Sequence, residues 1–118
     1  MRLLFVCVGN SCRSQMAEAI ARHLGHEAQS AGTHPADRVS TNAITVLNEM
    51  GISTDGLYPK LVEDIALNNQ TIISMGCGVS CPTIRIDEDW GLEDPVGKPI
   101  EIFRQTAETI KRKIIDLQ

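Results

Sequence analysis

The sequence predicts an α/β fold, formed as a single domain with a four-stranded parallel sheet and helices on both faces. Two kinds of segment, short apolar runs and stretches with helical periodicity, lead to this prediction. Short apolar runs that are typical of buried strands, such as Leu3–Val8, alternate along the chain with longer segments in which apolar residues recur every three or four positions. This alternation produces parallel sheets, because each connection between parallel strands passes through a helix that covers the sheet.

Each expected element has its own signal. The expected strands are Arg2–Val8, Glu27–Ala31, Thr71–Met75 and, with a weaker pattern, Thr83–Ile86. The expected helices are Arg13–Leu24, a second from Ser40 or Thr41 to Gly51, a short third at Leu61–Leu67, and Ile100–Leu117. Ligands of parallel sheets bind beyond the carboxyl ends of the strands. Cys7 and Met75-Gly76-Cys77 are therefore expected to lie at the same edge of the sheet.

Length and composition limit the classes of function. The 118 residues fit one domain, residues 1–118, and a net charge of −4 without a basic stripe argues against a nucleic-acid partner. Leu3–Val8 is too short for a signal peptide, and no apolar run reaches the ~20 residues of a membrane helix. We therefore expect a cytoplasmic protein without a membrane partner. Its four cysteines are then expected to be catalytic, redox-active or metal-binding rather than a disulfide framework.

The most informative stretch joins the first strand to the first helix and carries Cys7, Arg13 and Ser14. A backbone wrapped around Cys7 would form a nest of amides for an oxyanion, at the positive end of the helix. The guanidinium of Arg13 suits two oxygens of such an anion, and Ser14 could donate to the sulfur or cap the helix. The field also favours a Cys7 thiolate, placed for in-line attack on the central atom. The predicted oxyanion-binding residues are Val8, Gly9, Asn10, Ser11, Cys12 and Arg13.

A simpler interpretation exists for Cys7 taken alone. A cysteine at the end of a buried strand is most often a small apolar residue. A cysteine followed by an arginine six positions later also occurs by chance. The complete string, with its flanking strand and helix, is far more specific, and it favours oxyanion chemistry.

The string from Cys7 to Ser14 resembles the loop of the low-molecular-weight protein tyrosine phosphatase superfamily. The following residues, Gln15-Met16-Ala17-Glu18-Ala19, resemble its arsenate reductase branch, of the thioredoxin-linked type. With Asp94-Pro95 and the last helix, the resemblance covers nearly the whole chain. It implies that Cys7 is the nucleophile and Asp94 the general acid that protonates the departing oxygen. It further implies arsenate as substrate, phosphate or sulfate as competing anions, and no cofactor.

Cys77 and Cys81 favour a reductase over a phosphatase. Hydrolysis of a phosphate ester needs one thiolate, whereas reduction of arsenate to arsenite needs two electrons, which two thiols supply by forming a disulfide. The predicted relay begins with attack of Cys7 on arsenic, passes to Cys77 as arsenite leaves, and ends as a Cys77–Cys81 disulfide. Thioredoxin or another thiol reductant would reduce that bond. We also expect residues 76–82 to rearrange, because residues four apart on a helix lie beyond disulfide distance.

Three alternatives stay open. A small phosphatase acting on phosphotyrosine or other phosphomonoesters would use Cys7, Arg13 and Asp94 but no second cysteine pair. A phosphocarrier would only hold an anion. The four cysteines could instead bind zinc, although the spacing within each pair is not Cys-x2-Cys. Without zinc, Cys12 is expected to be a non-catalytic loop residue whose side chain turns away from the anion.

The resemblance also concerns a cation site beside the loop. Asn10, Glu18 and Ser30 match positions that support a cation in some relatives, and Lys60 takes the place of the remaining carboxylate. An ammonium group there would substitute for a potassium ion. We therefore expect no strong dependence on potassium.

Overall fold

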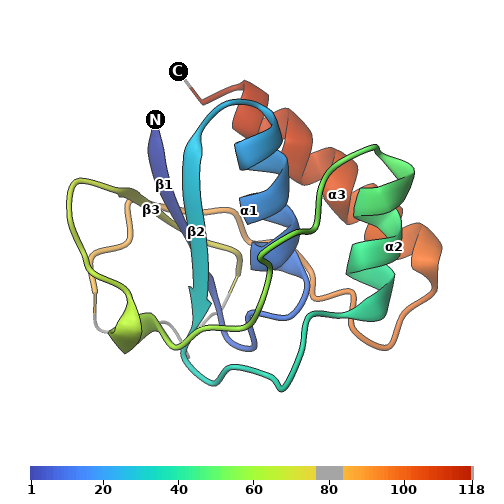
Figure 1. The fold of residues 1–118 in the computed structure, drawn as a ribbon, viewed down its shortest axis with the longest axis horizontal. Helices are drawn as coiled ribbons and strands as arrows, with labels where there is room; N and C mark the ends of the chain where they lie inside the picture. The colour runs from blue at the N-terminus through green and yellow to red at the C-terminus, as the bar shows by residue number, and fades with distance from the viewer. Residues whose placement is uncertain (77–83, 118) are drawn as a thin grey trace.

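A computed structural model describes residues 1–76 and 84–117 of the chain. Its strands β1 (Arg2–Cys7), β2 (Glu27–Gly32), β3 (Thr71–Ser74) and β4 (Glu88–Asp89) form one parallel sheet in the order β2-β1-β3-β4 (Figure 1). The described helices are α1 (Arg13–His23), α2 (Thr41–Glu49), α3 (Ile100–Ile115) and the 3-10 helix η1 (Val62–Asp64). The predicted α/β class and four-stranded parallel sheet are confirmed.

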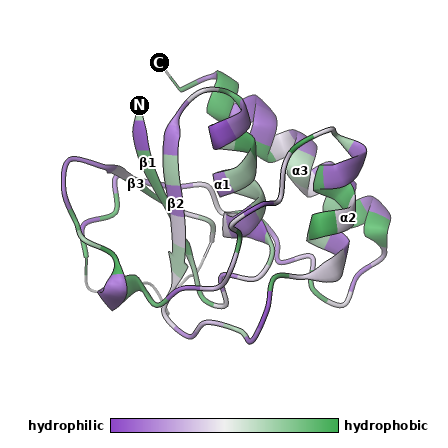
Figure 2. Ribbon diagram, viewed as in Figure 1, coloured by the Kyte–Doolittle hydropathy of each residue, from purple (hydrophilic) through white to green (hydrophobic). Residues whose placement is uncertain are grey.

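The larger part of the core lies between one face of the sheet and the helices. Leu3 and Phe5 of β1 belong to this part, together with Phe103 and Ile110 of α3. The helices α1, α2 and α3 contact one another and lie on this side of the sheet (Figure 1). Each of them carries both hydrophobic and hydrophilic residues (Figure 2), as expected for a helix that buries one side.

The opposite face of the sheet has a lighter cover. Leu4 and Val6 of β1 pack there against Val62 of η1, with Ile84 and Ile86 beside them. Among the described residues, this face is therefore covered by a short 3-10 helix and by extended chain, while the three α-helices share the other face.

Two elements differ from the sequence prediction. Leu61–Leu67 was expected to be helical, but the backbone is extended at Leu61 and Ile65, which leaves only the single turn η1 between them. The fourth strand is Glu88–Asp89 and not Thr83–Ile86, of which residues 84–86 are described. Asp87 marks where pairing with β3 starts. Its carboxylate accepts the backbone N–H of Ile72 at 2.7 Å, its own N–H donates to the Ile72 carbonyl oxygen at 2.8 Å, and the residues of β4 follow it.

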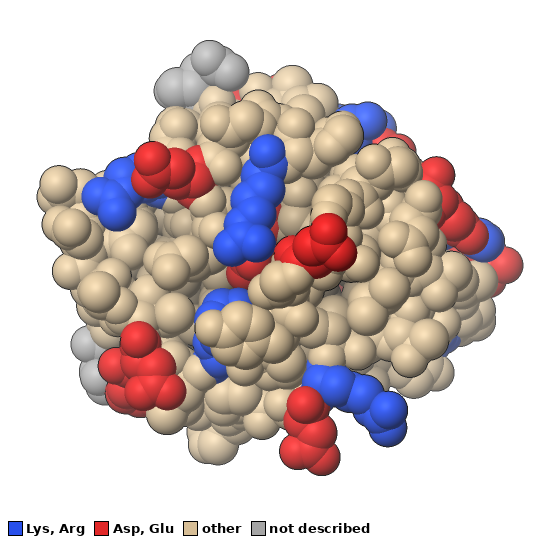
Figure 3. Space-filling view, in the orientation of Figure 1, with Lys and Arg blue, Asp and Glu red and all other residues tan. Residues whose placement is uncertain are grey.

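The charged side chains form no extended area of one sign on the face drawn in Figure 3. Acidic and basic groups are interspersed on this face. Across the described part of the chain several charged groups form ion pairs, as Arg104 does with Glu49 at 2.9 Å. Of the helices within residues 1–76 and 84–117, none has the length and apolar character needed to cross a bilayer.

The end of β2 lies against the loop that follows β1. A Cβ atom added to Gly32 would lie 2.5 Å from the carbonyl oxygen of Val8 and 3.0 Å from the Cβ of Asn10. Only glycine allows the backbone of the strand to approach the loop so closely.

We expect Gly32→Ala to lower the free energy of unfolding, measured by urea denaturation, by about 1–3 kcal/mol, the usual cost of over-packing. Gly9→Ala is the matched control, because a Cβ there would meet only the Ser11 hydroxyl oxygen, at 3.8 Å. The control should change the same quantity by less than about 1 kcal/mol. Equal losses in both variants would contradict the steric explanation.

Candidate active site

The loop between β1 and α1, residues 8–12, has its carbonyl groups bound by a neighbouring stretch of chain. We call this stretch, residues 33–40, the supporting segment. The backbone N–H groups of Thr33 and His34 donate to the carbonyl oxygens of Cys7 and Val8 at 3.3 and 2.9 Å. Those of Ala36 and Ser40 donate to the carbonyl oxygens of Gly9 and Ser11 at 2.9 and 2.7 Å. The carbonyl of Asn10 is bound by the Gln15 side chain at 3.0 Å. Every loop carbonyl from Cys7 to Ser11 therefore has a partner.

The direction of these carbonyls determines the direction of the loop amides. Across a trans peptide the C=O and the next N–H point in opposite directions. Fixing the carbonyls of residues 7–11 therefore turns the N–H groups of residues 8–12 to the other side of the loop. The N–H of Asn10 donates there to the Cys7 sulfur at 3.2 Å, and Asn10 has a φ of 49°, a left-handed conformation that asparagine tolerates. The amides thus form a concave nest around Cys7 that suits an oxyanion.

A chain of hydrogen bonds with a fixed direction ends on the Cys7 sulfur. The backbone N–H of Lys60 can only donate, so the Asn10 atom that it contacts at 2.8 Å is the amide oxygen. The Asn10 amide nitrogen then donates to the Ser14 hydroxyl at 2.7 Å. The Ser14 hydroxyl, whose hydrogen is still available, lies 2.8 Å from the Cys7 sulfur. The Asn10 N–H and the Ser14 hydroxyl are therefore both placed to donate a hydrogen bond to this sulfur.

Arg13 has one side of its guanidinium fixed and the other side free. Its Nη1 donates to the carbonyl oxygens of Met75 and Leu92 at 2.9 and 2.8 Å. Its Nε is buried without a hydrogen-bond partner among the described residues, and its Nη2 lies 3.9 Å from an Asp94 carboxylate oxygen. Nε and Nη2 form the donor fork that binds two oxygens of a tetrahedral anion. The fork is thus available beside the nest.

The Asp94 carboxylate has one partner in its own turn and one in the loop that follows β1. Its Oδ1 accepts the backbone N–H of Val96 at 3.1 Å and the Cys12 thiol at 3.6 Å. Cys12 is 3 % exposed, and burial, followed by the negative charge of Asp94, raises the pKa of its thiol to about 12. The Cys12 side chain therefore stays protonated and points to the carboxylate.

The chain that leaves β3 also reaches this site. Met75 donates its N–H to the carbonyl of Val6, and its own carbonyl accepts the N–H of Leu92 at 3.1 Å. Gly76 follows with a φ of +106°, and a Cβ there would lie 2.8 Å from the Leu92 carbonyl oxygen. The predicted residues Cys77 and Cys81 lie outside the described residues. What the structure describes is the entry to their segment, next to Cys7 and Arg13.

A buried carboxylate lies on the other side of the loop. Glu18 accepts the Ser30 hydroxyl at 2.7 Å and pairs with Arg22 at 2.9 Å and Lys60 at 3.4 Å. The Lys60 ammonium also donates to the carbonyl of Tyr58 at 2.8 Å. The ammonium group thus lies among the oxygen atoms that would otherwise surround a cation.

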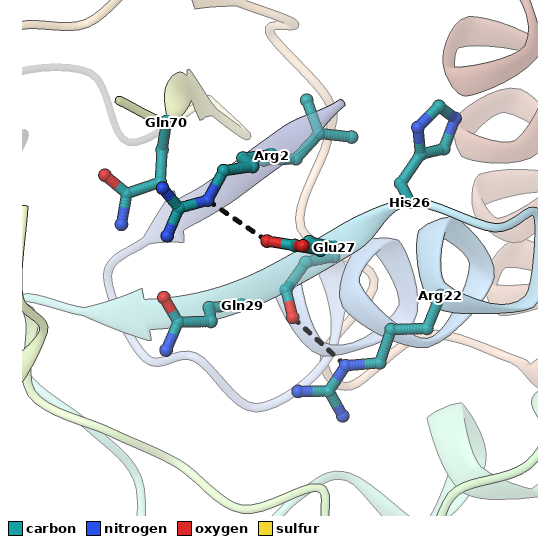
Figure 4. A pocket seen from close by; sticks show the side chains of 8 residues that line it. Arg2, Arg22, His26, Glu27, Gln29 and Gln70 are labelled. Carbon is teal, nitrogen blue, oxygen red and sulfur yellow. Dashed lines mark hydrogen bonds and ion pairs between the residues drawn. The ribbon is translucent and has the colours of Figure 1, made fainter. Parts of the chain in front are cut away.

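A cavity of about 450 Å³ lies at the opposite end of the sheet, beside the first residues of β1 and β2 (Figure 4). Its basic side chains already have partners. Arg2 pairs with Glu27 at 3.1 Å, and Arg22 donates to the carbonyl of Ala28 at 3.0 Å (Figure 4). The two arginines of this cavity are therefore already engaged, whereas the Nε of Arg13 has no hydrogen-bond partner among the described residues.

Sequence reasoning missed the parts of the site that act through the backbone. The supporting segment donates through main-chain amides, which any residue except proline carries, so no sequence signal marks it. Gln15 was noticed only through a family resemblance, yet its buried side chain ties Asn10 to the Tyr58 carbonyl. Within residues 1–76 and 84–117, no three side chains of His, Cys, Asp or Glu cluster as a metal site, and the zinc alternative depends on residues outside these ranges.

Comparison with protein families gives a match over residues 2–80 to the model described as low molecular weight phosphotyrosine protein phosphatase. Among curated proteins, the chain is 38% identical over 125 residues to a glutaredoxin arsenate reductase of Synechocystis sp., covering 98% of this chain and 95% of the relative.

Solved structures of both kinds of enzyme share the fold. An arsenate reductase in the phosphate binding state has a TM-score of 0.87 at 38% identity, over 99% of this chain and 96% of the other. A low molecular weight protein tyrosine phosphatase from T. tengcongensis has a TM-score of 0.80 at 34% identity, over 99% and 97%. A thioredoxin-dependent arsenate reductase of Corynebacterium glutamicum has a TM-score of 0.75 at 31% identity, over 99% of this chain and 63% of the other.

We expect Ser14→Ala to slow the alkylation of Cys7 by iodoacetamide at pH 7 about tenfold or more, because a hydrogen bond to a charged group contributes about 1.5–3 kcal/mol. Peptide mapping by mass spectrometry would follow Cys7 separately from the other thiols. Ser74→Ala is the matched control, since Ser74 is also fully buried but donates to Asp89. A rate unchanged by Ser14→Ala would exclude the hydroxyl as a donor that matters to the sulfur.

We expect Lys60→Met to lower the free energy of unfolding by about 1–3 kcal/mol, less than the about 3–5 kcal/mol lost when a buried charge loses its only partner. The loss should be smaller because Glu18 still pairs with Arg22 after Lys60 is removed. The melting temperature of the variant should be higher in potassium chloride than in choline chloride of equal ionic strength. Wild type and the surface control Lys98→Met should each have the same melting temperature in both salts. A potassium effect of the same size in wild type would refute the idea that the Lys60 ammonium takes the place of a potassium ion.

Proposed function

The chain belongs to the low molecular weight phosphotyrosine protein phosphatase family, and from this premise we propose that it reduces arsenate to arsenite. Arsenate reductase activity is supported for the family by the names of the matching relatives. The observation that carries the proposal for this chain is that β3, which precedes the second cysteine pair, ends beside Cys7.

The first step uses the nest and the fork of Arg13. Arsenate binds with its oxygens on the N–H groups of residues 8–12 and on Nε and Nη2 of Arg13. The Cys7 thiolate attacks arsenic, an oxygen leaves as water after protonation by Asp94, and a thiol-arsenate adduct forms. The free donor edge of Arg13 and the two donors on the Cys7 sulfur support this assignment.

The second step moves two electrons onto arsenic. The Cys77 thiolate attacks the Cys7 sulfur, the sulfur–arsenic bond breaks with both electrons staying on arsenic, and arsenite leaves as a Cys7–Cys77 disulfide forms. Cys81 then attacks Cys77, which frees Cys7 and leaves a Cys77–Cys81 disulfide. Support comes from the register of β1 and β3, in which Val6 lies opposite Ser74, and from the Arg13 bond to Met75.

A dithiol partner closes the cycle by reducing the final disulfide. We propose a thioredoxin-like protein, which fits a cytoplasmic location, where such reductants keep thiols reduced. Two similar proteins differ in the partner that their names give: one is a glutaredoxin arsenate reductase and the other is thioredoxin-dependent. The reductant is therefore a variable of the experiment below.

The second candidate function is a phosphatase acting on phosphomonoesters. The similarity to a low molecular weight protein tyrosine phosphatase favours it, as does the same set of nucleophile, fork and acid. Phosphotyrosine is the less suitable substrate among these esters. Of the four aromatic residues, Phe5, Trp90 and Phe103 are buried, and the exposed Tyr58 lies against Lys60 rather than beside Asp94.

Counting free thiols after a single arsenate turnover tests the relay. Wild type should lose two thiols, Cys81→Ser should trap a Cys7–Cys77 disulfide, and Cys77→Ser should form no intramolecular disulfide. The same samples are assayed for arsenite, with thioredoxin and with glutaredoxin as reductants, and for hydrolysis of p-nitrophenyl phosphate.

Each result has a clear consequence. Arsenite formation that survives in Cys77→Ser without loss of thiols would contradict the relay. Ester hydrolysis without any arsenite in wild type would replace the proposal with the phosphatase. A stable phosphocysteine that is neither hydrolysed nor reduced would point to an anion carrier.

A further inference from the structure

We propose that the Cys12 thiol is a positioning group for Asp94, holding the carboxyl in place for proton transfer and away from the anion-binding fork of Arg13. The proposal rests on the proposed function, in which Asp94 is the general acid. It assigns to Cys12 a role that is separate from the amide nest and from the disulfide relay.

The geometry places one carboxylate between two competing partners. Oδ1 of Asp94 is 3.6 Å from the Cys12 sulfur, and Oδ2 is 3.9 Å from Nη2 of Arg13. The side chain of Asp94 is 55% exposed, while those of Cys12 and Arg13 are buried. The half-exposed carboxylate thus has one buried partner at each of its two oxygen atoms.

The thiol is a permanent donor in this position. Burial, with Asp94 adding to it, raises the pKa of Cys12 to about 12, so the S–H hydrogen is present at every pH at which the enzyme would work. The second donor to Oδ1, the N–H of Val96, belongs to the same turn as Asp94 and moves with it. At the junction of the loop and α1, Cys12 therefore holds Oδ1, while Arg13 faces Oδ2.

Loss of the thiol would shift the balance toward Arg13. An ion pair between Asp94 and Nη2 would shorten and occupy half of the fork that the oxyanion needs. The carboxyl would also leave the position from which it reaches the departing oxygen. Both substrate binding and the chemical step should therefore weaken, although the Cys12 thiol touches neither substrate nor reacting atoms.

A double-mutant cycle separates positioning from general stability. We expect Cys12→Ala to lower kcat for arsenate reduction about tenfold and to raise KM for arsenate, as loss of one hydrogen bond to a charged group allows. Cys12→Val, which fills the space but lacks a donor, should do the same, and Cys12→Ser should restore part of the rate. In an Asp94→Asn background, Cys12→Ala should have no further effect on kcat.

A second measurement does not require arsenate turnover. The dissociation constant for inorganic phosphate, measured by isothermal titration calorimetry, should rise in Cys12→Ala and Cys12→Val because Asp94 then occupies Nη2 of Arg13. The same substitutions should leave this constant unchanged in the Asp94→Asn background, where no carboxylate can pair with Arg13.

The outcomes distinguish this proposal from the proposed function. Equal loss of kcat from Cys12→Ala in the wild-type and Asp94→Asn backgrounds would overturn positioning and leave the reductase intact. A phosphate affinity that is unchanged in Cys12→Ala would overturn it as well. A wild type that forms no arsenite, while the variants still lose phosphate affinity in an Asp94-dependent way, would refute the reductase and support the contact.

Discussion

The orientation of the peptide groups between Cys7 and Ser11 is the constraint on which the site depends. A loop of amides around a sulfur is unfavourable unless the carbonyls on its other side are bound, because buried polar groups without partners are costly. The supporting segment, residues 33–40, and Gln15 bind these carbonyls. The nest is therefore a property of two segments that are distant from each other along the chain.

Hydrogen bonds of the Asn10 and Arg13 side chains connect the same loop to the rest of the molecule. Asn10 accepts the backbone N–H of Lys60 and donates to the Ser14 hydroxyl, which in turn contacts the Cys7 sulfur. Arg13 donates from Nη1 to the carbonyl oxygens of Met75 and Leu92. Its Nε has no hydrogen-bond partner among the described residues and is available to an anion. Cys7, Arg13 and Asp94, the proposed nucleophile, anion fork and acid, thus meet at the junction between β1 and α1.

An anion loop of this kind does not by itself determine the reaction. Arsenate and phosphate have nearly the same shape and charge, which is consistent with reductases and a phosphatase sharing this fold. The difference lies in what approaches the sulfur next. Attack by water leads to hydrolysis, and attack by a second thiolate leads to reduction. In this chain β3, which precedes Cys77 and Cys81 in the sequence, ends at the edge of the sheet where Cys7 lies.

The amino-acid sequence by itself determined the class of the fold and the chemical character of the loop, because both depend on local patterns. Apolar runs alternating with helical periodicity predict a parallel sheet, and the complete string from Cys7 to Ser14, between a strand and a helix, predicts an anion site. β4 escaped prediction because it is a short exposed edge strand, whose pairing depends on Asp87 and not on an apolar pattern.

Only the tertiary structure decided which groups hold the loop open and where Cys12 points. Backbone donors from the supporting segment leave no trace in the sequence, and the contact between Cys12 and Asp94 joins residues at opposite ends of the chain. Such contacts follow from how the elements pack, and packing brings together residues whose separation along the chain carries no local signal.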